Sequence, residues 1–136
     1  MDRLLDAMAA DAALDMVTAA VPVDDAVRMA DPNVVKVVAA ADGTALYFSR
    51  SPIPYNRAAG GPDTRFLWHK GIYGYRREFL LRYKNWPPSR LEQLEQLEQL
   101  RALENGARIR VLETDDISPG VDTPEQAAEV ERILRG

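Results

Sequence analysis

The sequence predicts an α/β domain in which a mixed β-sheet is flanked by helices. Apolar, β-branched runs alternate along the chain with segments of helical period, and an Asp-Gly turn separates two of the apolar runs. With 136 residues, of which 46% are hydrophobic, the chain is predicted to form a single domain, residues 1–136.

The first part of the chain is predicted to alternate between helices and strands. Residues 2–13 are rich in Ala and Leu, which favours a helix, and residues 16–23 are β-branched and apolar, which is typical of a buried strand. A short helix over 24–29 begins with acids that suit its dipole. Strands over 34–39 and 45–49 flank the Asp42-Gly43 turn, which predicts a hairpin.

The middle of the chain begins with a long loop. Residues 50–64 contain three prolines and two glycines, so a helix there is not expected. Residues 66–75 alternate large side chains with Gly71 and Gly74, which predicts a strand. A helix over 76–83, with Phe79 facing inward, ends at the Asn85–Pro88 segment.

Residues 89–104 are predicted to form one helix, which ends at Asn105-Gly106 and contains a Leu-Glu-Gln repeat. Its leucines recur at every third position, so they spread over about half of the helix circumference, as in a core helix rather than a coiled coil. Glu98 and Arg101 fall between these leucines, and we expect them to form an ion pair or to contact a ligand. A strand over 107–113, a polar loop over 114–120 and a helix over 123–134 follow.

The charge distribution indicates an anionic small molecule as ligand. The chain carries a net charge of -4, yet residues 65–90 contain seven basic side chains against one acid. Such a local cationic surface on an acidic protein favours a small anion, and nucleic-acid binding is not expected. No apolar stretch has the length of a membrane span, the N-terminus lacks a signal core and the chain has no cysteine. We therefore expect a cytoplasmic protein that does not bind membranes.

Two carboxylates are candidates for a functional site, and each has a structural alternative. Asp122 either supports the dipole of the last helix or binds Mg²⁺, a cation that prefers oxygen ligands. Glu92 lies three residues after Ser89, which is the spacing of a capping box. The alternative is that Glu92 accepts hydrogen bonds from sugar hydroxyls.

Other candidates lie on the predicted strands. His69 is either a structural histidine or a donor to a carboxylate or hydroxyl. Arg50 follows a strand, where its guanidinium suits carboxylate capture, although exposed arginines are common. By strict alternation Tyr73 and Tyr75 share a face with His69, for ring packing or for stacking on a sugar.

Several segments, in this order, resemble the 3-deoxy-manno-octulosonate cytidylyltransferase family, also called CMP-Kdo synthetases. They are residues 45–54 (ALYFSRSPIP), 69–76 (HKGIYGYR), 86–92 (WPPSRLE), 97–101 (LEQLR) and 120–125 (GVDTPE). The resemblance implies a Rossmann-like nucleotidyltransferase fold and transfer of CMP from CTP to the acidic sugar Kdo, with release of pyrophosphate, for lipopolysaccharide synthesis. It implies Mg²⁺ as cofactor and Asp122 as a catalytic, metal-binding aspartate. It places five residues near the sugar: Arg50, His69, Tyr73, Glu92 and Glu95.

The resemblance also implies that the chain is the C-terminal half of this family, the half that binds the sugar and dimerises. The family's phosphate-binding loop and the rest of its N-terminal, CTP-binding half are not found in the sequence. We therefore expect the chain to be inactive alone and to work as a homodimer or with a companion chain. The alternative is a non-catalytic fragment that binds an acidic sugar or a partner.

Overall fold

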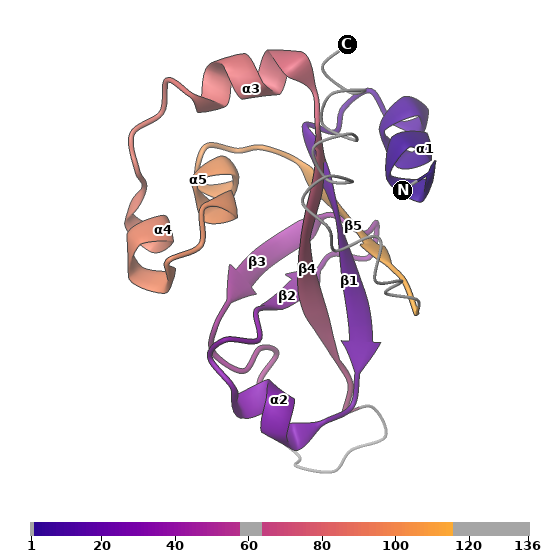
Figure 1. Ribbon diagram of the computed structural model, residues 1–136, viewed down its shortest axis with the longest axis vertical. Helices are drawn as coiled ribbons and strands as arrows, with labels where there is room; N and C mark the ends of the chain where they lie inside the picture. The colour runs from indigo at the N-terminus through magenta and orange to yellow at the C-terminus, as the bar shows by residue number, and fades with distance from the viewer. Residues whose placement is uncertain (1, 58–63, 116–136) are drawn as a thin grey trace.

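The structure is a computed structural model that describes residues 2–57 and 64–115. Figure 1 shows a five-stranded sheet with helices on both sides. The elements follow in the order α1 (Asp2–Ala10), β1 (Met16–Val23), α2 (Ala26–Ala30), β2 (Lys36–Ala39), β3 (Ala45–Ser49), β4 (Phe66–Tyr75), α3 (Arg77–Tyr83), α4 (Arg90–Glu95), α5 (Gln99–Glu104) and β5 (Ile109–Glu113).

The sheet is mixed, as predicted. Its strand order is β3-β2-β4-β1-β5, and β1 runs parallel to β5 while the other neighbouring strands are antiparallel. β1 lies between β4 and β5, where Met16 is opposite both Tyr75 and Ile109. β2 and β3 pair as the hairpin that the Asp42-Gly43 turn predicts.

The two faces of the sheet bury separate hydrophobic clusters, because successive residues of β1 point to opposite sides. Met16 and Ala20 join the cluster that packs against α3 and α5, where Phe79 and Leu100 are fully buried. On the opposite face, Val17 and its neighbours pack against α1 through a second cluster that also includes Leu4, Met8, Ala19 and Ile72. Both faces of β1 are therefore buried, as its apolar sequence predicts.

The predicted single helix over 89–104 is wrong, because the chain breaks into α4 and α5 at Gln96. Gln96 adopts a left-handed conformation with φ of 58°. Arg50 explains the break: its Nε donates to the Glu95 carbonyl at 2.7 Å and its Nη2 donates to the Gln96 carbonyl at 3.1 Å. In a continuous helix these carbonyls would accept bonds from residues four positions later.

The break also changes the positions of the repeated leucines. Leu97 and Leu100 are buried, but Leu94 is 66% exposed. The predicted wide apolar face is therefore only partly present. Among the described helices, none has the length and apolar content needed to cross a bilayer. Most of the loop predicted over 114–120 and the whole helix predicted over 123–134 lie outside the described residues.

Candidate functional site

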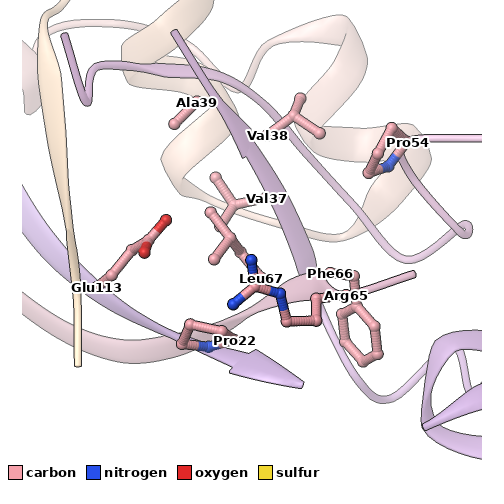
Figure 2. Close-up of a pocket in the computed structure, with 9 residues that line it drawn as sticks. All are labelled: Pro22, Val37, Val38, Ala39, Pro54, Arg65, Phe66, Leu67 and Glu113. Carbon is pink, nitrogen blue, oxygen red and sulfur yellow. The ribbon is translucent and has the colours of Figure 1, made fainter. Parts of the chain in front are cut away.

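Several hollows on the described surface, with volumes of about 350–500 Å³, are large enough for a small ligand. Figure 2 shows one of about 410 Å³, where β2 and β4 approach Glu113 at the end of β5. Its walls include Val37 and Leu67, with Arg65 and Glu113 as its only charged groups among the described lining residues. None of the sequence-predicted site residues that the structure describes lines it. Its described side chains therefore offer a sugar two charged groups, and backbone groups supply the remaining polar surface.

The second hollow, which we call the tyrosine pocket, has a volume of about 350 Å³ and includes one predicted site residue, Tyr73. It lies between the sheet, α3 and the α4–α5 break, and its described lining is Met16, Tyr73, Tyr75, Leu80, Tyr83, Gln96, Leu97, Glu98 and Gln99. Phenol rings offer flat apolar faces, while a carboxylate and two amides offer hydrogen bonds. This combination suits a ligand that carries many hydroxyl groups.

Tyr73 is the predicted residue that reaches this pocket directly. Its ring stacks on Tyr75 with centroids 5.7 Å apart and an angle of 28° between the planes. Burial raises the pKa of Tyr73 well above its ordinary value of 10.0, and the nearby Glu98 and Tyr83 add to the shift. The phenol therefore stays protonated and can donate a hydrogen bond to a ligand.

His69 lies beside Tyr73 but is not part of the pocket's described lining. Its ring centroid lies 5.5 Å from that of Tyr73 and 4.9 Å from that of Phe48, so the predicted shared face of His69, Tyr73 and Tyr75 is confirmed. Burial, with a contribution from Lys70, lowers the pKa of His69 to about 3. The imidazole is therefore neutral at physiological pH and does not offer a positive charge to an anion.

Arg50 uses its side chain to bind the protein's own backbone. Besides its bonds to the α4–α5 break, its Nη1 donates to the Pro32 carbonyl at 3.0 Å. Lys36 is fully buried and its Nζ donates to the carbonyls of Asp31 and Arg50, at 2.7 and 2.8 Å. Arg50 therefore joins the end of β3 to the α4–α5 break, rather than offering a free fork to a carboxylate.

Glu95 is likewise engaged within the protein. Its Oε2 accepts hydrogen bonds from the hydroxyls of Ser49 at 2.5 Å and Tyr47 at 3.1 Å, while Oε1 accepts from the Arg50 backbone N–H at 3.0 Å. Burial acts to raise the pKa of Glu95, but these hydrogen bonds outweigh it and hold the pKa below the usual carboxyl value. Glu95 thus anchors α4 to β3.

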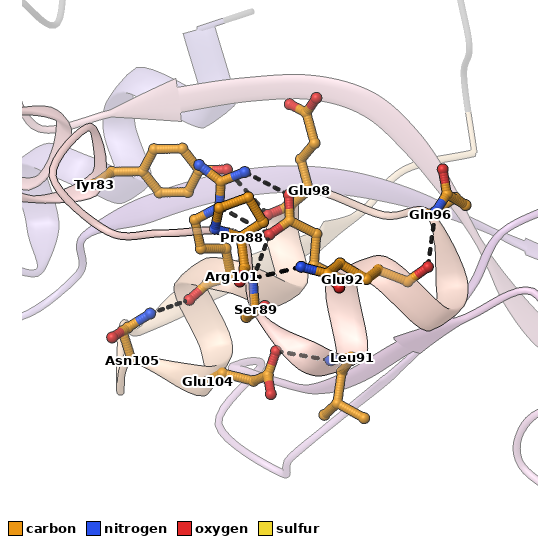
Figure 3. A network of polar contacts seen from close by, with 11 residues as sticks. Tyr83, Pro88, Ser89, Leu91, Glu92, Gln96, Glu98, Arg101, Glu104 and Asn105 are labelled. Atoms are coloured by element: carbon orange, nitrogen blue, oxygen red, sulfur yellow. Dashed lines mark hydrogen bonds and ion pairs between the residues drawn. The ribbon is translucent and has the colours of Figure 1, made fainter.

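Glu92 forms a buried ion pair behind the pocket wall (Figure 3). Its Oε1 accepts from Arg101 Nε at 2.8 Å and its Oε2 from Arg101 Nη2 at 2.5 Å. Oε1 also accepts from the Ser89 backbone N–H at 2.9 Å, which confirms the Glu92 half of the predicted capping box. The predicted Glu98–Arg101 pair is wrong, because the break between the helices brings Glu92 to Arg101 and leaves Glu98 exposed.

The same arginine connects this ion pair to the tyrosine pocket. The Arg101 guanidinium lies over the Tyr83 ring, 4.8 Å from its centroid, and the Tyr83 hydroxyl donates to the Glu98 carbonyl at 3.1 Å (Figure 3). Glu92 therefore supports the pocket from behind through Arg101 and Tyr83, and a direct contact with a sugar is not needed to explain its position.

The basic residues between 65 and 90 do not all face one site. Arg76 donates to the carbonyls of Met8, Asp11 and Leu14 and so fixes the end of α1. Arg82 pairs with Asp15 at 2.8 Å. The excess of positive charge in this segment therefore partly serves the fold, and none of the described residues that line the tyrosine pocket is a cation.

Gln99 is a pocket residue that the sequence did not predict. Gln99 is 8% exposed and lines the pocket, and within the described part of the chain its side-chain amide has no recorded hydrogen-bond partner. The sequence feature that came nearest to predicting Gln99 is the ligand contact expected at Glu98, its neighbour in the chain. The break at Gln96, which turns both residues toward Tyr73, depends on Arg50 and has no local sequence signal.

Asp122, the predicted catalytic and metal-binding residue, lies outside the described residues. Within 2–57 and 64–115, no group of three or more His, Asp or Glu side chains is arranged to hold a metal ion. The described residues therefore do not form a magnesium site by themselves, and the roles of Mg²⁺ and Asp122 stay predictions.

Comparison with known proteins identifies the family. A sequence model of the cytidylyltransferase family matches residues 1–109. The chain belongs to the cytidylyltransferase family. Curated relatives of this cytidylyltransferase-family chain include two proteins named 3-deoxy-manno-octulosonate cytidylyltransferase. The protein from Syntrophotalea carbinolica is 51% identical over 93% of this chain and 53% of its own length. The protein from Chlorobium luteolum is 48% identical over 99% of this chain and 54% of its own length.

A solved structure shows the same fold. The structure of CMP:2-keto-3-deoxy-manno-octonic acid synthetase complexed with CTP matches this cytidylyltransferase-family chain with a TM-score of 0.80 and 44% identity. The match covers 98% of this chain and 54% of that one, which confirms the predicted α/β nucleotidyltransferase fold. The chain spans about half the length of these relatives. Its assignment to their C-terminal half stays a prediction.

Proposed function

We propose that this chain forms the sugar-binding part of a CMP-Kdo synthetase, the enzyme that transfers CMP from CTP to Kdo. The tyrosine pocket carries this proposal, because it combines ring faces with the polar groups of Tyr73, Glu98 and Gln99. Kdo is a polyol, and such groups hydrogen-bond and stack on polyols. Relatives whose sequences are 48–51% identical to this chain are named for this activity, and they support the same assignment.

Calorimetric titration of Kdo into the chain tests the pocket. Tyr73→Phe removes only the phenol oxygen, so loss of one hydrogen bond should weaken Kdo binding about fivefold to tenfold. Tyr55→Phe is the matched control, because Tyr55 is 85% exposed and lies outside the pocket. Equal affinity of Tyr73→Phe and the unaltered chain would contradict the proposed pocket.

The proposed reaction requires CTP and Mg²⁺ as well as Kdo. Asp122 is the proposed metal ligand, supported by the family resemblance of residues 120–125. A bound Mg²⁺ would neutralise phosphate charge and lower the pKa of the attacking hydroxyl. In a mixture of CTP, Kdo and Mg²⁺, pyrophosphate release should require this chain together with a second chain that carries the remainder of a relative. Asp122→Asn should abolish that release, while Asp115→Asn should not.

A non-catalytic fragment that binds an acidic sugar or a partner is the second candidate, and it fits the described residues, none of which gather into a metal site. If the chain is a sugar-binding fragment of this kind, addition of Kdo should release heat. Pyrophosphate should then not form from CTP, Kdo and Mg²⁺, with or without the second chain. We further propose action in the cytoplasm, in lipopolysaccharide synthesis, as a homodimer or with a companion chain. Light scattering on the purified chain, with and without that second chain, measures the assembly directly.

A further inference from the structure

Thr18 lies where β4 bulges away from β1. Thr18 is opposite Tyr73, but the next residue, Ala19, is opposite Lys70, so Gly71 and Ile72 have no partner on β1. Thr18 is fully buried. Its hydroxyl oxygen lies 2.7 Å from the Ile72 carbonyl oxygen, 3.2 Å from the Lys70 carbonyl oxygen and 3.0 Å from His69 Nε2. The hydroxyl therefore occupies the space that the bulge opens.

The number of hydrogens decides how these contacts are made. A hydroxyl has one hydrogen to donate, and carbonyl oxygens only accept. If that hydrogen goes to the Ile72 carbonyl, the shortest contact, Nε2 of His69 must carry a hydrogen and donate it to the Thr18 oxygen. In the opposite arrangement the hydroxyl donates to Nε2, and its oxygen then faces the carbonyl oxygens of Ile72 and Lys70 without a hydrogen between them. The first arrangement makes two hydrogen bonds and the second makes one, so the first is favoured.

We infer that Thr18 is a positioning residue that holds His69 as the neutral Nε2–H tautomer and leaves Nδ1 as a hydrogen-bond acceptor. The surroundings fix the ring as well: the His69 backbone N–H donates to the Val35 carbonyl at 2.8 Å, and Phe48 and Tyr73 contact the ring. Burial opposes a second proton on the imidazole, since the charged form would lose its hydration.

The tautomer determines which ligand group His69 can meet. A neutral ring with a bare Nδ1 attracts the hydrogen of a hydroxyl and repels a carboxylate. If the chain binds Kdo as proposed and the sugar extends from the tyrosine pocket to His69, the ring contacts a hydroxyl of the sugar, and the sugar's carboxylate is bound elsewhere. Only this last step rests on the proposed function. The tautomer itself is a property of the unliganded chain.

Nitrogen-15 NMR of the imidazole tests the inference, and the assignment is direct because the chain has one histidine. In the unliganded chain at neutral pH, we expect a pyrrole-type signal for Nε2 and a pyridine-type signal for Nδ1. Thr18→Ser keeps the hydroxyl and should retain this pattern. Thr18→Val keeps the shape but removes the hydroxyl, and should move both signals toward the averaged positions of exchanging tautomers.

Two results would overturn the inference: an Nδ1–H pattern in the unaltered chain, or an unchanged Nε2–H pattern in folded Thr18→Val. If Thr18→Val does not fold, as judged by backbone amide dispersion, Thr18→Ala takes its place under the same criteria. Addition of Kdo then separates the two proposals. A shift of the Nδ1 signal supports a hydroxyl contact. An unchanged signal with measurable Kdo binding rejects that contact, and absence of Kdo binding counts against the proposed function while leaving the tautomer established.

Discussion

Glu92 and Arg101 face each other across the break between α4 and α5, and two parallel hydrogen bonds join them. Their side chains are only 9% and 18% exposed. A paired fork of this kind is geometrically specific, because both oxygens and both N–H groups must align. The pair therefore fixes the angle between two short helices that the backbone alone does not connect rigidly.

Glu92→Gln should lower the free energy of unfolding by about 2–3 kcal/mol, because it leaves the partly buried Arg101 without its counter-charge. Urea unfolding measures the change. Glu78→Gln, an exposed carboxylate on α3, is the matched control and should change stability by less than about 0.5 kcal/mol. Equal midpoints for both variants would show that the ion pair contributes nothing net.

The same pair predicts a pH dependence. Hydrogen bonds from Arg101 hold the pKa of Glu92 below its ordinary value of 4.5. A carboxyl with a depressed pKa stabilises the fold above the unfolded value and loses that contribution as the pH falls through the folded pKa. The stability difference between the unaltered chain and Glu92→Gln should therefore be constant near neutrality and shrink below about pH 4.5. A difference that grows on acidification would contradict this assignment.

His69 predicts a second pH effect, in a different window. Its pKa is about 3 in the folded chain against an ordinary value of 6.5, so between these values the unfolded chain binds a proton that the folded chain does not. Stability should fall by about 2 kcal/mol between roughly pH 7.5 and 5.0. His69→Gln should lose this slope, since no other histidine is present. Urea unfolding at each pH provides the measurement, and an equal slope in both proteins would exclude a buried neutral imidazole.

Arg50→Lys should lower stability by about 1–2 kcal/mol, because an ammonium cannot reach the Pro32, Glu95 and Gln96 carbonyls together. Arg57→Lys, in the exposed loop, serves as control. Thermal unfolding gives the stability, and Kdo titration separates the two roles of Arg50. Unchanged stability with at least tenfold weaker Kdo binding would instead identify Arg50 as a direct ligand of the sugar.

Gln96→Gly should be neutral or raise stability by up to about 1 kcal/mol, because glycine adopts positive φ without strain. Gln93→Gly, inside α4, should lower stability by about 0.5–1 kcal/mol, since glycine there only adds freedom to the unfolded chain. Opposite signs for the same chemical change would verify the break. Destabilisation by both substitutions to the same extent would favour a continuous helix.

The strands were predicted more accurately than the helices because their signal is local. The bounds of β1, β3 and β4 match the prediction, and the paired hairpin follows from its turn. The continuous helix failed at Gln96, because leucine spacing carries no information about an arginine 46 residues earlier in the chain. When a distant side chain captures helix carbonyls, tertiary bonds override the local preference.

The residues of the candidate site also divide into those that a local sequence pattern predicts and those that depend on distant contacts. Glu92 at capping-box spacing could be predicted from sequence, and the structure confirms its bond to Ser89. The roles of Arg50 and Glu95 could not be predicted, because Arg50 bonds backbone carbonyls, which every residue carries, and the partners of Glu95 lie 45 to 48 residues earlier in the chain. Gln99 lines the pocket because the helix breaks at Gln96, and that break is stabilised by Arg50, which is distant in sequence.

The central position of β1 has a consequence for synthesis of the chain. β1 ends at Val23, whereas β4 and β5, the strands on either side of it, begin only at Phe66 and Ile109. Pairings between such distant segments form slowly, since a long stretch of chain must first be brought together. On the ribosome, an apolar strand with two open edges therefore waits until β4 and β5 emerge, and this interval is when association with other nascent chains competes with folding.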